Sequence, residues 1–414
     1  MSQPRCMRLM RLGLSLGSVG CHDAAWRHPS VPADGDMDFR HIARCAQIAE
    51  AGKLDFIVLA DVAAVPDLDD PRVARHREQG HVKLEPLMLV AALAAVTDHV
   101  GLVPTVSTGL HHPFALARRL ASIDHLSQGR AGWTMVTDIS ADEAGNYSQD
   151  GASDSATRHE RAREFLAVVQ GLFDGWEPGA FPRDLASGLY MDPARMHRLN
   201  HLGRHFKVRG PSDVDRPPQG ALPLITAGTS DDAQDLAAEV ADMVYGGQPT
   251  IEGARNHYAS VKARLPGCGR SADSLRMMPG IMPVIGRTQG EAEDLFASLQ
   301  DRLLPEAAPG VLAIPRVFEA VSRGFRQLRV VGTPGQVADV MEEWFSTAAA
   351  DGFIVQPPLL PLGADGFVRL VVPELQRRGL FRTEYEGSTL RENLGLHAAV
   401  PRQWAGRDRL EEAR

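Results

Sequence analysis

Four short apolar runs in this chain each stop abruptly at a small polar residue or a glycine, and this repeated pattern restricts the fold more than any other feature. The clearest run, Ala131–Val136, is followed at once by Thr137. The others are Leu54–Ala60 before Asp61, Val100–Val106 before Ser107, and Leu222–Ala227 before Gly228. Runs of this length without alternation are typical of strands buried on both faces. The pattern predicts parallel strands whose carboxyl ends open into polar loops.

Helical patterns lie between these runs, with apolar residues at spacings of three and four. They are Ile42–Gly52, Pro86–Asp98, Phe114–Leu126, His159–Gly175 and Asp232–Asp242. Strands that alternate with helices indicate parallel strands joined by crossover helices. The fold class is therefore α/β.

The chain length favours a barrel over an open sheet. Its 414 residues exceed the roughly 250 of a plain (β/α)8 barrel but fit a barrel with insertions. Four further runs bring the expected strands to eight: Arg8–Leu16, Asp242–Tyr245, Met277–Ile285 and Gly352–Gln356. No G-x-G-x-x-G follows the first strand, so the dinucleotide-binding open sheet has no support. We expect a single (β/α)8 TIM barrel over residues 1–396.

Two segments exceed a minimal barrel and are expected to be insertions, after the fourth and the seventh helix. They are Glu177–Ala221, with a weak strand signal at Arg204–Arg209, and Leu304–Thr333, with a helical patch at Val317–Phe325. Long connections of this kind often cover a functional site, so we interpret both as covers of the barrel mouth or of an oligomer face. Phe367–Leu380 is predicted to be helical, and residues 397–414 form a charged tail.

Composition excludes several classes of protein. The net charge of −8 argues against nucleic acid as a partner, and no apolar run approaches the roughly 18 residues of a membrane helix. The four cysteines show no paired spacing, so neither a disulfide framework nor a zinc site is indicated. A cytoplasmic location is the resulting expectation.

Several segments together resemble a known family. They are LADV (59–62), STGLHHPFALARRLASIDHLSQGRAGWTMVT (107–137), RPPQG (216–220), AGTS (227–230), GTPGQVAD (332–339) and VVPELQRRGLFRTEYEGSTLRENLGL (371–396). In order and spacing this set resembles the bacterial-luciferase-like flavin monooxygenases. The resemblance is to the branch of nitrilotriacetate monooxygenase component A, dibenzothiophene sulfone monooxygenase and pristinamycin synthase.

The resemblance implies a two-component enzyme built on a TIM barrel. Such an enzyme takes reduced FMN from a separate NAD(P)H:flavin reductase, reacts it with O2 to a C4a-peroxide, and oxygenates a small organic substrate. A homodimer or homotetramer is implied as well. Position by position, the residues that match the family's FMN contacts are Asp61, Ser107, Thr137, Ser155, His159, Thr229 and Ser230. No residue is implied to carry the chemistry itself, because the flavin does so.

The same residues can also be interpreted without the family resemblance. Ser230 precedes the helical run DDAQDLAAEVADM, so it is a good N-cap, and the amide groups there could also hold a phosphate. The acids Asp231 and Asp232 would repel a phosphate that they faced. Asp61 either caps its loop or accepts a hydrogen bond from the flavin. For each residue, both interpretations, a local structural role and a role in binding the cofactor, stay open.

This chain departs from the family pattern at three places. Thr134 takes the position of the Asn in the strand-four motif G-W-N, and His159 replaces the aromatic hydroxyl expected at the start of the fourth helix. Asn146-Tyr147-Ser148 stands where Asn-Phe-Gly is common. A histidine can donate to a phosphate and adds positive charge when protonated.

Two other enzyme classes remain as alternatives. A barrel of the same superfamily that uses deazaflavin F420 would transfer hydride and leave O2 unused. A metal-dependent barrel hydrolase would need ligands that converge at strand ends, such as Asp61, His111 and Asp138, although no recognisable metal-ligand spacing links them. The adjacent histidines His111 and His112 are expected to point in different directions.

Overall fold

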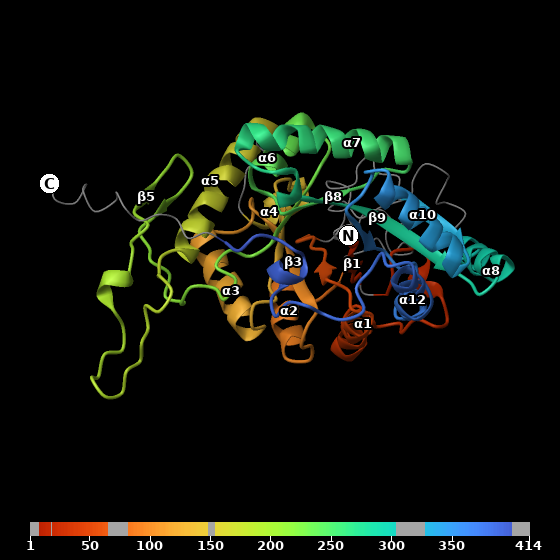
Figure 1. Cartoon of the computed structure of the whole chain (residues 1–414), viewed down its shortest axis with the longest axis horizontal. Helices are drawn as coiled ribbons and strands as arrows, with labels where there is room; N and C mark the ends of the chain where they lie inside the picture. Colours follow the sequence, from red (N-terminus) through yellow and green to blue (C-terminus); the bar gives the residue numbers. More distant parts are fainter. Residues whose placement is uncertain (1–7, 18, 65–81, 148–153, 304–327, 400–414) are drawn as a thin grey trace, which may run out of the picture.

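Eight parallel strands close into a barrel in the computed structural model, which describes residues 8–17, 19–64, 82–147, 154–303 and 328–399 (Figure 1). Closure occurs where β9 pairs with β8 on one side and with β11 on the other, while β11 pairs with β1. The barrel strands are β1 (Arg11–Ser15), β2 (Phe56–Leu59), β3 (Gly101–Ser107), β4 (Trp133–Val136), β7 (Leu224–Ala227), β8 (Met243–Gly246), β9 (Arg276–Ile285) and β11 (Gly352–Val355). The predicted TIM barrel is confirmed.

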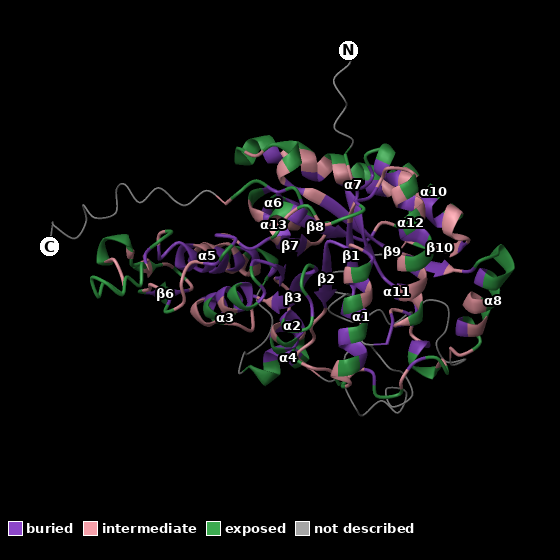
Figure 2. Cartoon of the chain, turned by 60° about the horizontal axis from the view of Figure 1, so that its bottom comes forward, coloured by how far each residue is buried: buried purple, intermediate pink, exposed green. Residues whose placement is uncertain are grey.

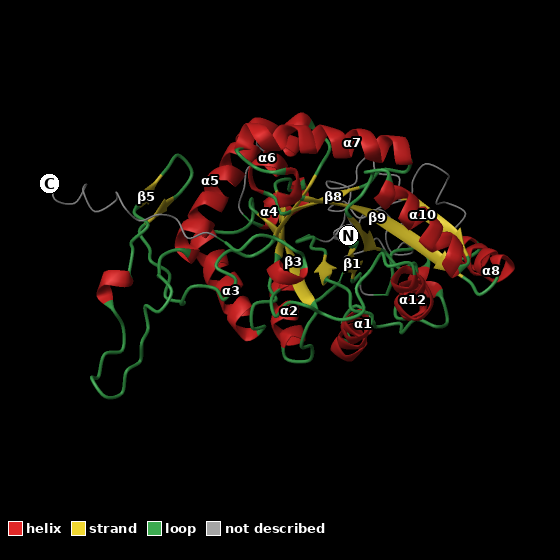
Figure 3. Cartoon of the chain, in the orientation of Figure 1, coloured by secondary structure: helices red, strands yellow, loops and turns green. Residues whose placement is uncertain are grey.

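Helices surround this barrel and connect successive strands (Figure 3). They are α1 (Phe39–Ala51), α2 (Pro86–Ala94), α3 (Pro113–Leu126), α4 (Ala141–Asn146), α5 (Ser155–Phe173), α6 (Asp231–Val240), α7 (Ile251–Arg264), α8 (Gln289–Gln300), α10 (Pro334–Ser346), α11 (Leu362–Gly366), the π-helical turn η5 (Phe367–Val371), α12 (Val372–Arg377) and α13 (Leu390–Asn393). Short 3-10 turns lie at η1 (Ala25–Arg27), η2 (Pro193–Arg195), η3 (Leu265–Cys268) and η4 (Ala272–Ser274). Among the described residues no helix is long and apolar enough to cross a membrane.

The strands carry apolar side chains on both faces, as their sequence predicts. Trp133 and Met135 of β4 belong to the large core cluster that includes α5 residues such as Phe165, so this face of β4 packs against helices. The alternate positions face the barrel interior. A separate cluster fills that interior with Phe56, Val58, Val103, Ile225, Met243, Tyr245, Met278 and Ile354.

The last described helix, α13, closes the amino end of the barrel. Leu390 joins the interior cluster, and a Cβ on Gly101, the first residue of β3, would lie 2.5 Å from its Cδ1. Arg11, the first residue of β1, donates to the Asn393 carbonyl at 2.7 Å. Burial of this end leaves the carboxyl end of the barrel as the face that can open to ligands.

An ion pair fixes the segment that leads to α13. Arg382 lies 2.5 Å from the Asp55 carboxylate, and both side chains are almost fully buried. Asp55 also accepts from the Leu12 amide at 2.7 Å, which ties the pair to β1. Burial raises the pKa of Asp55, whereas the positive charges of Arg382 and Arg11 oppose that rise.

The segments expected to be insertions contain strands of their own. Leu328–Gly332, inside the expected insertion Leu304–Thr333, forms strand β10. This strand pairs in parallel with the carboxyl half of β9, Ile281–Ile285. The sequence pattern did not predict this strand, because an edge strand is only partly buried and shows no clear apolar run. The helical patch expected at Val317–Phe325 lies outside the described residues.

The segment after α5 extends away from the barrel (Figures 1 and 2). It carries the two-stranded hairpin of β5 (His201–Leu202) and β6 (Lys207–Val208), which agrees with the weak strand signal at Arg204–Arg209. Glu164 of α5 holds the hairpin by accepting from the amides of His205 and Phe206, at 2.9 and 2.8 Å.

Candidate functional site

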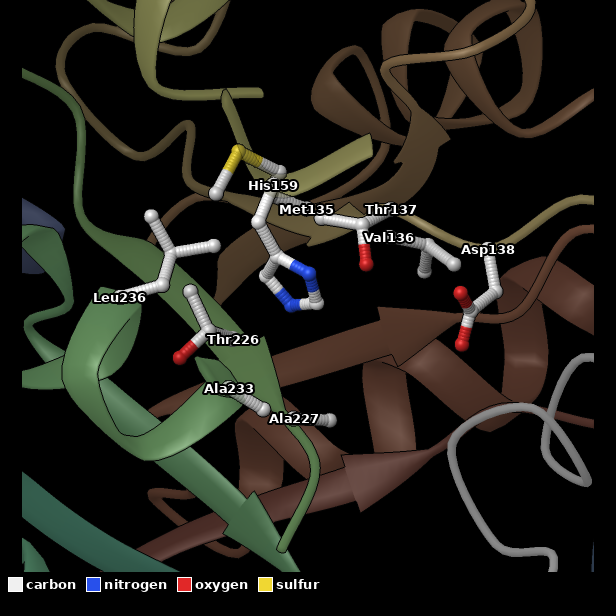
Figure 4. A pocket seen from close by; sticks show the side chains of 9 residues that line it. All are labelled: Met135, Val136, Thr137, Asp138, His159, Thr226, Ala227, Ala233 and Leu236. Atoms are coloured by element: carbon white, nitrogen blue, oxygen red, sulfur yellow. The ribbon is translucent and has the colours of Figure 1, made fainter. Parts of the chain in front are cut away.

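A small pocket opens where β4 and β7 end, between these strands and the helices α5 and α6 (Figure 4). Its lining residues are Met135, Val136, Thr137, Asp138, His159, Thr226, Ala227, Ala233 and Leu236. The strands place it at the carboxyl end of the barrel, where enzymes of this fold bind their ligands. Two of the residues predicted from the sequence, Thr137 and His159, line this pocket.

His159 is a buried residue whose ring points into the pocket (Figure 4), rather than a surface residue at the start of a helix. Its Nδ1 lies 2.8 Å from the Ser155 carbonyl and 3.3 Å from the Ser155 hydroxyl. A carbonyl only accepts, so Nδ1 must carry a proton and donate. Ser155 therefore acts on the pocket by orienting the imidazole, which leaves Nε2 for another partner.

Ser230 begins α6, and its hydroxyl accepts from the Ala233 amide at 3.3 Å, as expected of an N-cap. Thr229 and Ser230 are both exposed, beside the pocket wall formed by Ala233. The carboxylate of Asp231 lies 2.6 Å from Arg264 of α7. This pairing compensates the charge of one of the two acids that could repel an anion at this helix start.

Two threonine hydroxyls near the strand ends are buried and have no hydrogen-bond partner among the residues that the structure describes. Thr226 Oγ1 belongs to a residue that lines the pocket, and Thr134 Oγ1 lies on β4 beside Thr105 of β3, its register partner. A buried hydroxyl without a partner is unfavourable by about 1–3 kcal/mol, so such groups often mark a ligand site. The pocket thus offers a hydroxyl and an imidazole to an oxygen-rich group.

The charge of Asp138 on the pocket wall is balanced by Arg158. Arg158 Nη2 lies 2.8 Å from the Asp138 carboxylate, and its Nε lies 2.9 Å from the same oxygen. The pair joins the loop after β4 to the first turn of α5. An anion in the pocket would therefore meet a paired carboxylate, which repels it less than a free one.

Asp61 and Ser107 lie at the ends of β2 and β3 and do not line this pocket. The Asp61 carboxylate is 3.5 Å from Lys83 Nζ, an ion pair that the sequence did not suggest. Burial raises the pKa of Asp61 and lowers the pKa of Lys83. The Ser107 hydroxyl accepts from the Gly109 amide at 3.2 Å. The structure thus divides the seven predicted residues between the pocket and the neighbouring strand ends.

The ligand set considered for a metal-dependent hydrolase does not come together. Asp61 pairs with Lys83, and Asp138 pairs with Arg158. In the described ranges, no three side chains of His, Cys, Asp or Glu are arranged to hold a metal ion. His112 caps α3 by accepting a hydrogen bond from the Phe114 amide at 3.3 Å. Burial lowers the pKa of its neighbour His111.

Comparison with known proteins identifies the family. The family model described as luciferase-like monooxygenase matches residues 21–351. The chain is 38% identical to N-acetyl-S-(2-succino)cysteine monooxygenase of Bacillus subtilis (strain 168), over 95% of this chain and 98% of that protein. It is 38% identical to nitrilotriacetate monooxygenase component A of Aminobacter aminovorans, over 94% of this chain and 96% of that protein.

A solved structure agrees with these relatives. The crystal structure of a riboflavin lyase with modified FMN and the substrate riboflavin superimposes with a TM-score of 0.85 and 30% identity, over 94% of this chain and 96% of that chain. The resemblance inferred from the sequence motifs is confirmed. The chain therefore belongs to the luciferase-like monooxygenase family and is an enzyme of the oxidoreductase class.

Proposed function

We propose that this chain is the oxygenase component of a two-component, FMN-dependent monooxygenase that oxygenates a small organic substrate with O2. The observation that carries the proposal is the pocket between β4 and β7, into which the His159 ring points (Figure 4). Its position at the strand ends, its unpartnered Thr226 hydroxyl and the adjoining start of α6 suit the phosphate of FMN.

The proposed cofactor is FMN, bound in its reduced form. Donors for the phosphate would be the His159 imidazole, the Thr226 and Thr137 hydroxyls, and the amides at the start of α6. The solved riboflavin lyase, similar over most of its length, contains a modified FMN, which supports the same kind of cofactor here. Reduced FMN would supply the electrons that activate O2, and this chain would bind it, orient it and exclude water.

Asp61 and Ser107 would contribute from the neighbouring strand ends, nearer the flavin ring or the ribityl chain than the phosphate. The Asp61 carboxylate accepts hydrogen bonds only, and Lys83 keeps its charge balanced. In this arrangement Asp61 could accept from a flavin N–H or a ribityl hydroxyl. The ion pair would position the carboxylate for that contact.

A separate NAD(P)H:flavin reductase is the proposed partner, and we expect a homodimer or homotetramer. The relative from Aminobacter aminovorans is described as component A, which fits an enzyme of more than one component. No Gly-rich dinucleotide fingerprint follows the first strand of this chain, so we assign it no nicotinamide site.

Reductase dependence can be measured without knowing the substrate. The purified chain, mixed with NADH or NADPH and FMN in air, is expected to consume no nicotinamide above the uncatalysed rate. Addition of a purified flavin reductase should start consumption at the rate set by the reductase. Nicotinamide consumption by the chain alone would contradict the two-component assignment.

A further inference from the structure

Two buried polar side chains, those of Gln356 and Tyr245, form a hydrogen-bonded pair inside the barrel, apart from the residues discussed so far. Gln356 directly follows β11, and Tyr245 lies on β8. The two residues are 1% and 5% exposed. Gln356 Nε2 donates to the Tyr245 hydroxyl at 2.5 Å. Tyr245 belongs to the interior cluster, so the carboxamide that contacts it also lies within the barrel.

Gly280 of β9, the strand between β8 and β11, leaves the space that this pair occupies. A Cβ on Gly280 would lie 3.0 Å from the Tyr245 hydroxyl oxygen and 3.2 Å from Gln356 Nε2. A glycine inside a strand packs no side chain, and it often marks a place that another group approaches closely. The strands β8, β9 and β11 therefore together hold the carboxamide in this position.

The oxygen of the Gln356 carboxamide lacks a partner. Oε1 is buried and makes no hydrogen bond within the described ranges of the chain. A buried acceptor without a partner is unfavourable, so such an atom often marks a place where a ligand or a water molecule binds. The hydrogen bond from Nε2 to Tyr245 fixes the orientation of the carboxamide. Because a carboxamide oxygen only accepts, the missing partner is an N–H or O–H donor.

The pair lies at the carboxyl end of the barrel, in the half of the strand ring formed by β8, β9 and β11. The residues proposed to bind the flavin follow β2, β3, β4 and β7 instead. Tyr245 is in register with Ala227, which lines the pocket proposed for the phosphate, so the pair lies at the same level of the barrel as that pocket. A flavin bound along β2 to β7 leaves the half with Gln356 for the substrate.

We infer, on the basis of the proposed function, that Gln356 anchors the organic substrate through Oε1, which accepts a hydrogen bond from an N–H or O–H group of that substrate. Tyr245 is the positioning residue, because its hydroxyl holds the carboxamide in the orientation that presents Oε1. The substrate class is thereby restricted to molecules with such a donor, as in amides, amines and alcohols. An analogue without the donor is rejected, because Oε1 then stays buried and unpaired.

Two small probes that differ in one donor test this inference. They are 2-pyrrolidinone, which has an N–H group, and N-methyl-2-pyrrolidinone, which has none. The full-length chain is saturated with reduced FMN without air, and the dissociation constant of each probe is measured by NMR titration. The wild type should prefer 2-pyrrolidinone. Gln356→Met keeps the length of the side chain without the oxygen and should lower this preference by about three- to tenfold, as expected for one neutral hydrogen bond.

Tyr245→Phe keeps the carboxamide but removes the hydroxyl that orients it, so this variant should lose part of the preference. Reduced FMN should bind equally to the wild type and to Gln356→Met. Weaker flavin binding by Gln356→Met would assign Oε1 to the flavin and overturn the substrate role. An unchanged preference, or no binding of either probe, would leave Oε1 to a water molecule and overturn it as well. A wild-type chain that binds no reduced FMN would contradict the proposed function itself.

A matched substitution separates a ligand role from a structural one. Gln219 is also buried, but its side chain is fully paired. Its Nε2 donates to Asp124 and to the Ala131 carbonyl, at 2.6 and 2.7 Å, and its Oε1 accepts from the Arg391 amide at 2.9 Å. Gln219→Met should therefore lower the thermal midpoint more than Gln356→Met, which also removes an unpaired oxygen. A larger loss in Gln356→Met would show that the carboxamide supports the fold and would overturn its assignment to the substrate.

Discussion

The His159 ring donates its Nδ1–H to the Ser155 carbonyl, 2.8 Å away and one helical turn earlier in α5. This hydrogen bond fixes the tautomer of the neutral ring, because a carbonyl can only accept. Nε2 then presents a lone pair to the pocket unless the ring takes up a second proton. A phosphate, which mainly accepts, can be bound well by Nε2 only when the imidazole is protonated.

The affinity for reduced FMN is therefore expected to depend on the hydrogen-bond donor that residue 159 offers to the phosphate. His159→Tyr, whose phenol donates, should bind reduced FMN at least as tightly as the wild type, and His159→Leu should bind it weakly. Anaerobic fluorescence titration measures each affinity. Reduced riboflavin, which lacks the phosphate, is the control and should show no dependence on His159. Identical binding of reduced FMN by the three proteins would remove His159 from the site.

A second prediction separates the capping role of Ser230 from a ligand role. Ser230→Ala removes the hydrogen bond to the Ala233 amide and should lower the free energy of unfolding by about 0.5–2 kcal/mol. The matched control is Thr333→Ala, which removes the equivalent N-cap of α10. If the start of α6 holds the phosphate, Ser230→Ala weakens binding of reduced FMN and Thr333→Ala does not. Equal affinities in both variants would leave Ser230 as a cap alone.

A third prediction concerns acid stability and His22, a buried residue in the loop after β1. Burial lowers its pKa to about 4, and the nearby Arg329 acts in the same direction. The Nδ1 lone pair accepts from the Ala24 amide at 3.1 Å, which requires an unprotonated Nδ1. The unprotonated, buried His22 therefore contributes to the free energy of unfolding. This contribution is complete above the ordinary histidine pKa of about 6.5 and is lost as the pH falls toward 4.

Protonation of His22 should therefore destabilise the fold at acid pH, by roughly 3 kcal/mol at the lower end of this range. The check is the thermal midpoint of the wild type and of His22→Asn at pH values from 7 down to 4.5. The Asn side chain can still accept from Ala24 but does not titrate, so the variant should lose less of its stability. Parallel curves for the two proteins would show that His22 does not limit acid stability.

A fourth prediction concerns the closed end of the barrel. Arg382→Met leaves Arg11, 3.8 Å away, as the cation paired with the buried Asp55 carboxylate in the described part of the chain. Loss of one member of a buried ion pair typically lowers the free energy of unfolding by about 3–5 kcal/mol. Arg369→Met, which breaks an exposed pair with Asp365, is the control and should change it by about 0.5 kcal/mol or less. Urea unfolding of both variants measures the difference, and equal losses would be inconsistent with this account.

The barrel and the strand ends could be predicted from sequence because buried parallel strands leave a clear signature. Each apolar run ends where a polar loop starts, and this pattern predicted Thr137 at the carboxyl end of a barrel strand. The same apolar pattern does not show on which face of a strand a side chain lies, because both faces are apolar. Thr226 was therefore missed, although it lies inside a predicted strand and its hydroxyl is an unpartnered group at the pocket.

Other features depend on contacts between segments far apart in the chain. Lys83, just before α2, lies beside Asp61, just after β2, and no local pattern in the sequence marks this contact. Leu390 likewise closes the barrel end through contacts with strands that are distant in the sequence, so no local pattern predicts its role. Helix α10 has a recognisable sequence pattern, the Thr333–Gln336 capping box followed by an amphipathic run. It was nevertheless not among the predicted helices.

The central claim, that this chain binds reduced FMN and controls its reaction with O2, is tested most directly by stopped-flow mixing. The chain is first saturated with reduced FMN without air and then mixed with oxygenated buffer, while the return of oxidised-flavin absorbance is followed. The account predicts that the chain delays this return relative to free reduced FMN, and that His159→Leu shortens the delay. Flavin that reoxidises as if the chain were absent, or a chain that instead binds F420 tightly and ignores reduced FMN, would contradict it.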